Sequence, residues 1–151
     1  MKLLGIDYGT KRIGIAISDE NAILAFPKEI VLNNLDGFNK IAKIVKTENI
    51  SEIVVGESVD FSDKLNILSA QIEIFILELK NRFKLPIHKQ KEFLTSIEAR
   101  KMGNNKRSLN QSQAHSKIKK IKGEHIDASA AALILQRYLD KMNNSNKKIL
   151  Q

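Results

Sequence analysis

Hydrophobic residues at the start of the chain form two short runs that are separated by a polar turn. Residues 3–7 and 13–18 are rich in Ile and Leu, and the first run ends in a carboxylate, Asp7. Apolar runs of this length between turn residues are typical of strands buried in a sheet. The pattern predicts an antiparallel hairpin, in which Gly5 and Gly9 leave room beside Asp7 for a backbone or a ligand to approach closely.

The rest of the chain alternates between strand and helix patterns. Three further strands are predicted over residues 29–32, 52–55 and 85–89. Helices are predicted over residues 38–47, 63–83, 95–102 and 127–142. This order predicts an α/β domain with a five-stranded mixed sheet flanked by helices. At 151 residues, we expect a single domain over residues 1–142 and a frayed polar tail over residues 143–151.

Composition excludes several kinds of chemistry. The chain has no Cys, which excludes disulfides, thiolate metal sites and a Cys nucleophile. The apolar runs are too short or too interrupted by acidic residues for a signal peptide or a membrane-spanning helix. We therefore expect a cytoplasmic protein without a membrane partner.

The positive charge of the chain is concentrated in one segment. The net charge is +8, and residues 99–122 contain many Lys and Arg residues but no acidic residue, whereas the remainder is balanced. A basic run of this kind is often only a solvated stretch. A local excess on an otherwise neutral body also suits a polyanionic partner, and nucleic acid is the leading candidate.

Three acidic residues lie where a carboxylate is conspicuous: Asp7, Glu92 and Asp127. On its helix Asp127 shares a face with Ala131 and Ile134, so it is expected to point towards the sheet. Taken singly, Asp7 could accept hydrogen bonds from turn amides, Asp127 could cap its helix, and Glu92 could be a surface acid. Together, three acids around one apolar sheet would repel one another unless they shared a cation, and oxygen ligands favour Mg²⁺ or Mn²⁺.

Three motifs in order resemble those of the YqgF/RuvX family, a set of small bacterial RNase H-like proteins described as Holliday junction resolvases. Residues 7–16 read DYGTKRIGIA, residues 91–99 read KEFLTSIEA, and residues 122–131 read KGEHIDASAA. The resemblance extends from about residue 3 to residue 138, which is nearly the whole chain.

The resemblance implies an RNase H-like fold and a phosphodiester hydrolase. Asp7, Glu92 and Asp127 fall on the positions of the family's catalytic carboxylates, which would bind Mg²⁺ or Mn²⁺. It implies a nuclease of structured nucleic acid, and we favour the processing of the 5′ end of precursor 16S rRNA, with ribosomal particles as a further partner. The alternatives are a Holliday junction resolvase acting on branched DNA and a non-catalytic RNA- or ribosome-binding module. The sequence leaves the oligomeric state open.

Five basic residues are predicted to hold phosphates without reading sequence. They are Lys11, Arg12, Arg100, Lys106 and Arg107.

Two departures from the family pattern bear on catalysis. Lys91 and Phe93 replace the Asp and Arg that flank the motif Glu in the family, and Glu57 and Ser58 follow Gly56 where the family has Leu and Pro. Glu57 is expected either to lie near Asp7 and replace the missing acid or to be a solvated surface residue.

A different class of protein shares part of the first motif. Residues 7–10 also resemble the first phosphate loop of actin-like and Hsp70-like ATPases and sugar kinases. Those enzymes close two related subdomains around a nucleotide, and this chain has room for one, so the nuclease interpretation is preferred.

Overall fold

The core of the fold is a five-stranded mixed sheet with strand order β3-β2-β1-β4-β5. A computed structural model describes residues 1–59, 65–93 and 115–149. The strands are β1 (Lys2–Asp7), β2 (Arg12–Ser18), β3 (Ala25–Leu32), β4 (Ile50–Val59) and β5 (Ile87–Phe93). β1, β2 and β3 pair antiparallel, whereas β4 and β5 run parallel to β1. The predicted α/β class and the five-stranded mixed sheet are confirmed.

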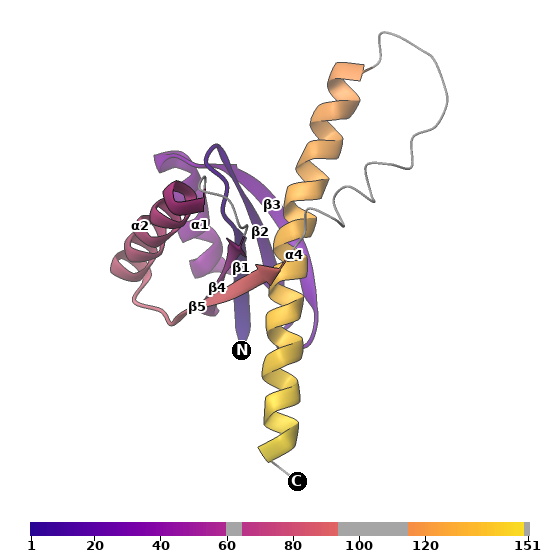
Figure 1. Ribbon diagram of the computed structural model, residues 1–151. Helices are drawn as coiled ribbons and strands as arrows, with labels where there is room; N and C mark the ends of the chain where they lie inside the picture. Colours follow the sequence, from indigo (N-terminus) through magenta and orange to yellow (C-terminus); the bar gives the residue numbers. More distant parts are fainter. Residues whose placement is uncertain (60–64, 94–114, 150–151) are drawn as a thin grey trace.

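The helices cover both faces of the sheet (Figure 1). Helices α1 (Leu35–Thr47) and α2 (Leu65–Phe83) bury Ile and Phe side chains against one face. Helix α4 (His115–Ile149) packs across the other face and extends past the sheet at both ends. Two apolar cores result, one on each side of the sheet.

The third strand is longer than the sequence predicts. It begins at Ala25 and includes Pro27, whereas the prediction started the strand at Glu29. β3 is an edge strand that pairs only with β2, so the missing N–H of Pro27 can face away from the ladder. A register shift between Ile15 and Ala16 of β2 lies opposite the proline.

The first helix also begins earlier than predicted, at Leu35 rather than Phe38. Asn34 accepts a hydrogen bond from the Gly37 amide at 2.9 Å and caps the helix. Gly37 is required there because a Cβ atom at this position would lie 1.7 Å from the Leu32 carbonyl oxygen. The residues that suggest a turn in the sequence therefore form the first turn of α1.

The strands β4 and β5 continue past the predicted ends. Their pairing extends to Val59 and Phe93, whereas the prediction ended these strands at Val55 and Lys89. Polar residues at the end of each strand obscure the pattern, but the backbone hydrogen bonds of the ladder continue. The helix predicted over residues 95–102 lies outside the described residues.

The last helix starts before and ends after the predicted residues 127–142. Gly123 does not interrupt it, since a single helical Gly costs only about 1 kcal/mol and no Pro follows. Residues 143–149, predicted to be a frayed tail, are helical. Asn143 Nδ2 donates to the Ala22 carbonyl oxygen at 2.9 Å, which ties this end of α4 to the β2–β3 turn. None of the helices in the described parts of the chain is long and apolar enough to cross a membrane.

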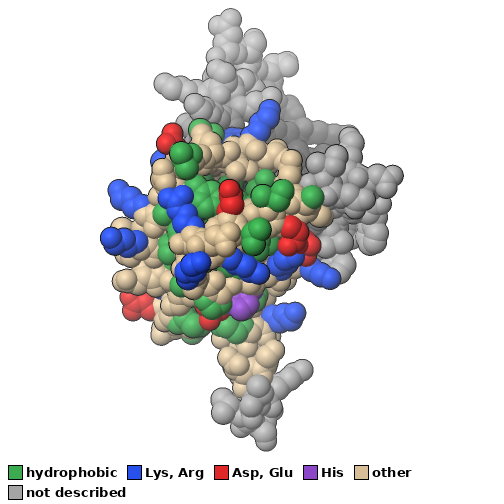
Figure 2. Space-filling model, turned by 90° about the vertical axis from the view of Figure 1, so that its left-hand side faces the viewer, with side chains coloured by type: hydrophobic (Ala, Val, Ile, Leu, Met, Phe, Trp, Pro, Cys, Tyr) green, Lys and Arg blue, Asp and Glu red, His purple; other side chains and the backbone are tan. Residues whose placement is uncertain are grey.

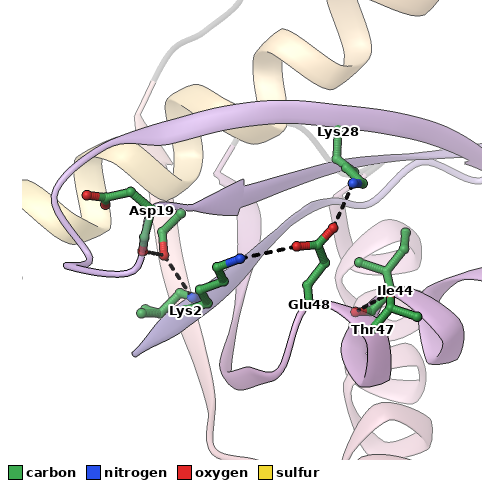
Figure 3. A network of polar contacts seen from close by, with 8 residues as sticks. Lys2, Asp19, Lys28, Ile44, Thr47 and Glu48 are labelled. Carbon is green, nitrogen blue, oxygen red and sulfur yellow. Dashed lines mark hydrogen bonds and ion pairs between the residues drawn. The ribbon is translucent and has the colours of Figure 1, made fainter.

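A small ionic network joins three elements at the edge of the sheet where β1 begins (Figure 3). The Glu48 carboxylate, at the end of α1, accepts from Lys28 Nζ at 2.8 Å and from Lys2 Nζ at 3.3 Å. Hydrogen bonds from Lys28 and then Lys2 lower the pKa of Glu48 below its ordinary value. The network therefore stabilises the fold when Glu48 is ionised.

Replacing Glu48 with Gln should lower the free energy of unfolding at neutral pH by at most about 1 kcal/mol, the usual value for an exposed pair. Because the folded pKa is depressed, this contribution is present above about pH 4.3 and is lost as the pH falls through the folded pKa. Urea unfolding at about pH 7 and about pH 3 measures both values. Glu20→Gln, at an exposed turn position, is the control. An equal loss at both pH values would contradict the prediction.

Candidate active site at the carboxyl edge of the sheet

Asp7 lies in a pocket formed by the turn between β1 and β2. It is the last residue of β1, is partly buried and pairs with Gly14. The pocket has a volume of about 240 Å³. Its lining consists of Asp7, Gly9, Thr10, Lys11, Arg12 and Gly14. The structure thus places two predicted phosphate-binding residues, Lys11 and Arg12, in the same pocket as Asp7.

The turn beside Asp7 is held in a fixed shape. A Cβ atom at Gly9 would lie 2.3 Å from the Arg12 carbonyl oxygen, so only glycine fits. Asn33 Nδ2 donates to the Gly9 carbonyl oxygen at 2.9 Å, and the Asn33 amide donates to the Lys11 carbonyl oxygen at 3.0 Å. Asn33 is not among the predicted site residues, because nothing in the sequence pattern indicates that a residue after β3 supports this turn.

Asp7 belongs to the face of the sheet that α4 covers. Side chains alternate between the two faces along a strand. Leu3 lies four residues before Asp7 and therefore on the same face, and it is buried in the core beneath α4. Between them, Gly5 lies under the helix: a Cβ atom there would be 2.7 Å from Leu135 Cβ and 3.0 Å from the Ala131 carbonyl oxygen. The expected close approach at Gly5 is therefore made by helix α4.

The backbone of β5 brings Glu92 to the same edge of the sheet. In β5 the ring of His88 contacts the ring of Tyr138 in α4, with centroids 5.1 Å apart. Position 92 pairs with Ser58 near the carboxyl end of β4. The backbone of Glu92 therefore lies at the same edge of the sheet as Asp7, while its side chain lies outside the described part.

Helix α4 carries position 127 towards the same edge. Tyr138 contacts His88, which pairs with Val54, whereas Ile134 lies over Gly56, two residues nearer the carboxyl end of β4. Lower residue numbers in α4 thus lie closer to the carboxyl edge, and the helix runs antiparallel to β4. Asp127, about two turns before Ile134, follows this direction. Its side chain also lies outside the described part.

Glu57 lies on the opposite face of the sheet, so the hypothesis that it joins Asp7 is wrong. Ile53 and Val55 precede Glu57 at alternate positions and are buried in the α1–α2 core. Tyr8, which follows Asp7, is on this face as well, and its ring lies 5.0 Å from that of Phe75 in α2. The prediction ended the strand at Val55; because β4 continues to Val59, the alternation of side chains places Glu57 on this face.

Lys91, which replaces an Asp of the family pattern, lies on the face of the sheet away from Asp7. Lys91 pairs with Glu57, and both positions alternate onto the α1–α2 face. The side chain of Phe93 lies outside the described part of the chain. The loss of the family's Asp at position 91 therefore does not bring a cation onto the face that carries Asp7.

The remaining site predictions are not decided by the described residues. Arg100, Lys106 and Arg107 lie outside them. Among the described side chains, no group of three or more His, Cys, Asp or Glu residues could hold a metal ion. Of the three predicted ligands, only the side chain of Asp7 is part of that set.

Gly5→Ala should lower the free energy of unfolding by about 1–3 kcal/mol, because the new Cβ atom meets Leu135 Cβ and the α4 backbone, neither of which can turn away. Gly56→Ala is the matched comparison. Its Cβ atom would meet Ile134 Cδ1, the far end of a flexible side chain, so we expect a smaller loss. Urea unfolding of both variants gives the order. A greater loss for Gly56→Ala would show that α4 can lift from Gly5.

The chain is similar in sequence to a known protein family over nearly its whole length. A family model described as RuvX, Holliday junction resolvase, matches residues 1–141. A protein of Lawsonia intracellularis named "Putative pre-16S rRNA nuclease" is 34% identical over 151 residues, which cover 99% of this chain and 100% of that protein. A protein of the same name from Maridesulfovibrio salexigens is 32% identical over 141 residues, with 92% and 98% covered.

Solved structures show the same RNase H-like fold. RuvC of T. thermophilus in complex with a Holliday junction substrate has a TM-score of 0.53 and 15% identity, with 92% of this chain and 93% of that chain covered. The Fowlpox virus resolvase in complex with Holliday junction DNA has a TM-score of 0.51 and 13% identity, with 94% and 99% covered. The match of the family model over residues 1–141 and the full-length relatives show that this chain belongs to the RuvX family.

Proposed function

We propose that the protein is a divalent-metal-dependent nuclease that processes the 5′ end of precursor 16S rRNA. The observation that carries this proposal is the position of Asp7: it ends the central strand, on the α4 face, in a pocket that also contains Lys11 and Arg12. A carboxylate beside two cations suits a metal ion together with a phosphate. Relatives over the full length of the chain are named for pre-16S rRNA.

We assign the metal ligands to Asp7, Glu92 and Asp127. Their backbone positions belong to β1, β5 and α4, three elements that approach one edge of the sheet. A donor set made only of carboxylates fits Mg²⁺ or Mn²⁺. When bound, such ions activate a water molecule and stabilise the leaving oxygen of a phosphodiester.

The basic side chains at the β1–β2 turn would bind phosphates of the substrate. Lys11 and Arg12 would neutralise the phosphates on either side of the bond that is cut, and would do so without reading sequence. Arg100, Lys106 and Arg107 would extend this contact. Precursor ribosomal particles are the proposed setting, which agrees with the expected cytoplasmic location.

Branched DNA is the second candidate substrate. The family model is described by Holliday junction resolution, and resolvases share the fold. Resolution needs two coordinated cuts and therefore a symmetric assembly. We favour RNA because one cut suffices, and a four-way DNA junction belongs in every cleavage assay as the competing substrate.

Asp7→Asn should reduce cleavage of a 5′-extended 16S transcript by at least about 100-fold in Mg²⁺ or Mn²⁺, because the variant loses a charged oxygen ligand. The fold should be intact, since Asp7 lies at a strand end. Initial cleavage rates measure the effect. Asp36→Asn, at an exposed position in α1, removes the same charge as a control. Cleavage by Asp7→Asn at the parent rate would mean that Asp7 only supports the turn.

Replacing Lys11 and Arg12 together with Ala should weaken RNA binding and flatten its dependence on salt. Each lost phosphate contact lowers the slope of log K against log salt by about 0.7 for single strands. Binding titrations at several salt concentrations measure the slope. Lys46→Ala with Lys141→Ala makes the same charge change at exposed sites away from the pocket. Equal slopes for the two double variants would place the binding face elsewhere.

A second comparison addresses the basic segment. The triple variant of Arg100, Lys106 and Arg107, each changed to Ala, should also lower the slope. A slope equal to that of the parent protein would show that these three residues make no phosphate contacts.

A further inference from the structure

A second pocket opens on the α1–α2 side of the molecule, the side that faces the viewer in Figure 2. It lies between the start of α1 and the last turns of α2, and its volume is about 550 Å³. Its lining includes Asn33, Asn34, Leu35, Glu78, Asn81 and Arg82. This volume is within the range of small-ligand sites, although the pocket is open to solvent and most of its lining residues are polar.

This second pocket shares a wall with the Asp7 pocket. Asn33 lines the second pocket, and its side chain donates to the carbonyl oxygen of Gly9, which lines the first. The Asn33 amide is also hydrogen-bonded to Lys11. The two pockets are thus connected through Asn33, which lines the second pocket and hydrogen-bonds to the turn that lines the first.

On one side of the pocket, the planar guanidinium of Arg82 lies beside apolar side chains. Arg82 Nη2 donates to Asn39 Oδ1 at 2.6 Å, and the guanidinium carbon lies 5.6 Å from the ring centroid of Phe38. Leu35 is 72% exposed although it is a large apolar residue at the start of α1. A planar ring can stack on a guanidinium and contact Leu35 at the same time.

The other side offers polar atoms that are available to a ligand. Glu78 and Asn81 are exposed on the same helix as Arg82. Within the described part of the chain, neither side chain makes a hydrogen bond or an ion pair. Glu78 can only accept from N–H groups when ionised, whereas Asn81 can both donate and accept.

We propose that this pocket binds the base of an unpaired nucleotide next to the bond that is cut, and that it prefers bases with an amino group. Single-stranded RNA is recognised by bases that are splayed out, stacked and hydrogen-bonded along their edges. The Glu78 carboxylate accepts from the amino groups of adenine, cytosine or guanine, whereas uracil has none; the same carboxylate repels a phosphate. This inference rests on the proposed function, because it is the substrate near Asp7 that brings a nucleotide to Asn33.

The test measures binding without cleavage. The full-length protein, free of divalent metal, is titrated with fluorescent oligo(A), oligo(C) and oligo(U) of about eight nucleotides. We expect the parent to bind oligo(A) and oligo(C) about 3–10-fold more tightly than oligo(U), about 1 kcal/mol. Glu78→Ala should remove this difference in affinity between oligo(U) and the other two oligonucleotides. Asn81→Ala should weaken the binding of oligo(A) and oligo(C).

Glu20→Ala is the matched control, since it removes the same charge at an exposed turn position and should keep this difference in affinity. If Glu78→Ala and Asn81→Ala bind all three oligonucleotides as the parent does, the pocket is not a base site. That result leaves the nuclease proposal intact when Asp7→Asn abolishes cleavage. Conversely, Glu78→Ala could bind the three oligonucleotides equally while Asp7→Asn cleaves at the parent rate. That pair of results would support the base site and contradict the assignment of Asp7.

Discussion

The close packing of α4 on the sheet is the constraint on which the candidate site depends. The helix meets the sheet where β1 and β4 have glycines, Gly5 and Gly56, and a single added Cβ atom at either would collide with α4. At Gly5 the neighbours are Leu135 Cβ and the α4 backbone, and in a close-packed interior they leave no room for a displacement. Asp7 belongs to β1 and Asp127 to α4. The distance between them is therefore set by how closely α4 packs on Gly5 and Gly56.

The two faces of the sheet differ in the residues that they carry near its carboxyl edge. Asp7 lies on the α4 face, whereas Glu57 and Lys91 are register partners at positions on the α1–α2 face. Lys91, which replaces the family's Asp, therefore lies at the end of the β4–β5 ladder on the face away from Asp7.

Much of the fold follows from local pattern, and the misses have identifiable causes. The first hairpin and the helix over residues 65–83 follow clear apolar patterns, and burial makes these patterns reliable. The errors occur where backbone pairing continues past a proline, as in β3 at Pro27, or into polar residues, as in β4 at Glu57. The sequence could identify Asp7 as conspicuous, but the face of Glu57 depends on where a strand ends, and the role of Asn33 depends on a contact distant in sequence.

The carboxyl-terminal part of helix α4 is held by hydrogen bonds to the β2–β3 region. Gln136 and Asn143 hydrogen-bond to the β2–β3 turn, so its carboxyl half is held at the far end of the sheet. Its amino-terminal part projects past the sheet (Figure 1). Twelve residues separate His115 from Asp127, which corresponds to about 18 Å of helix. In the proposed complex with RNA, a projection of this length would extend over more than one nucleotide of the strand.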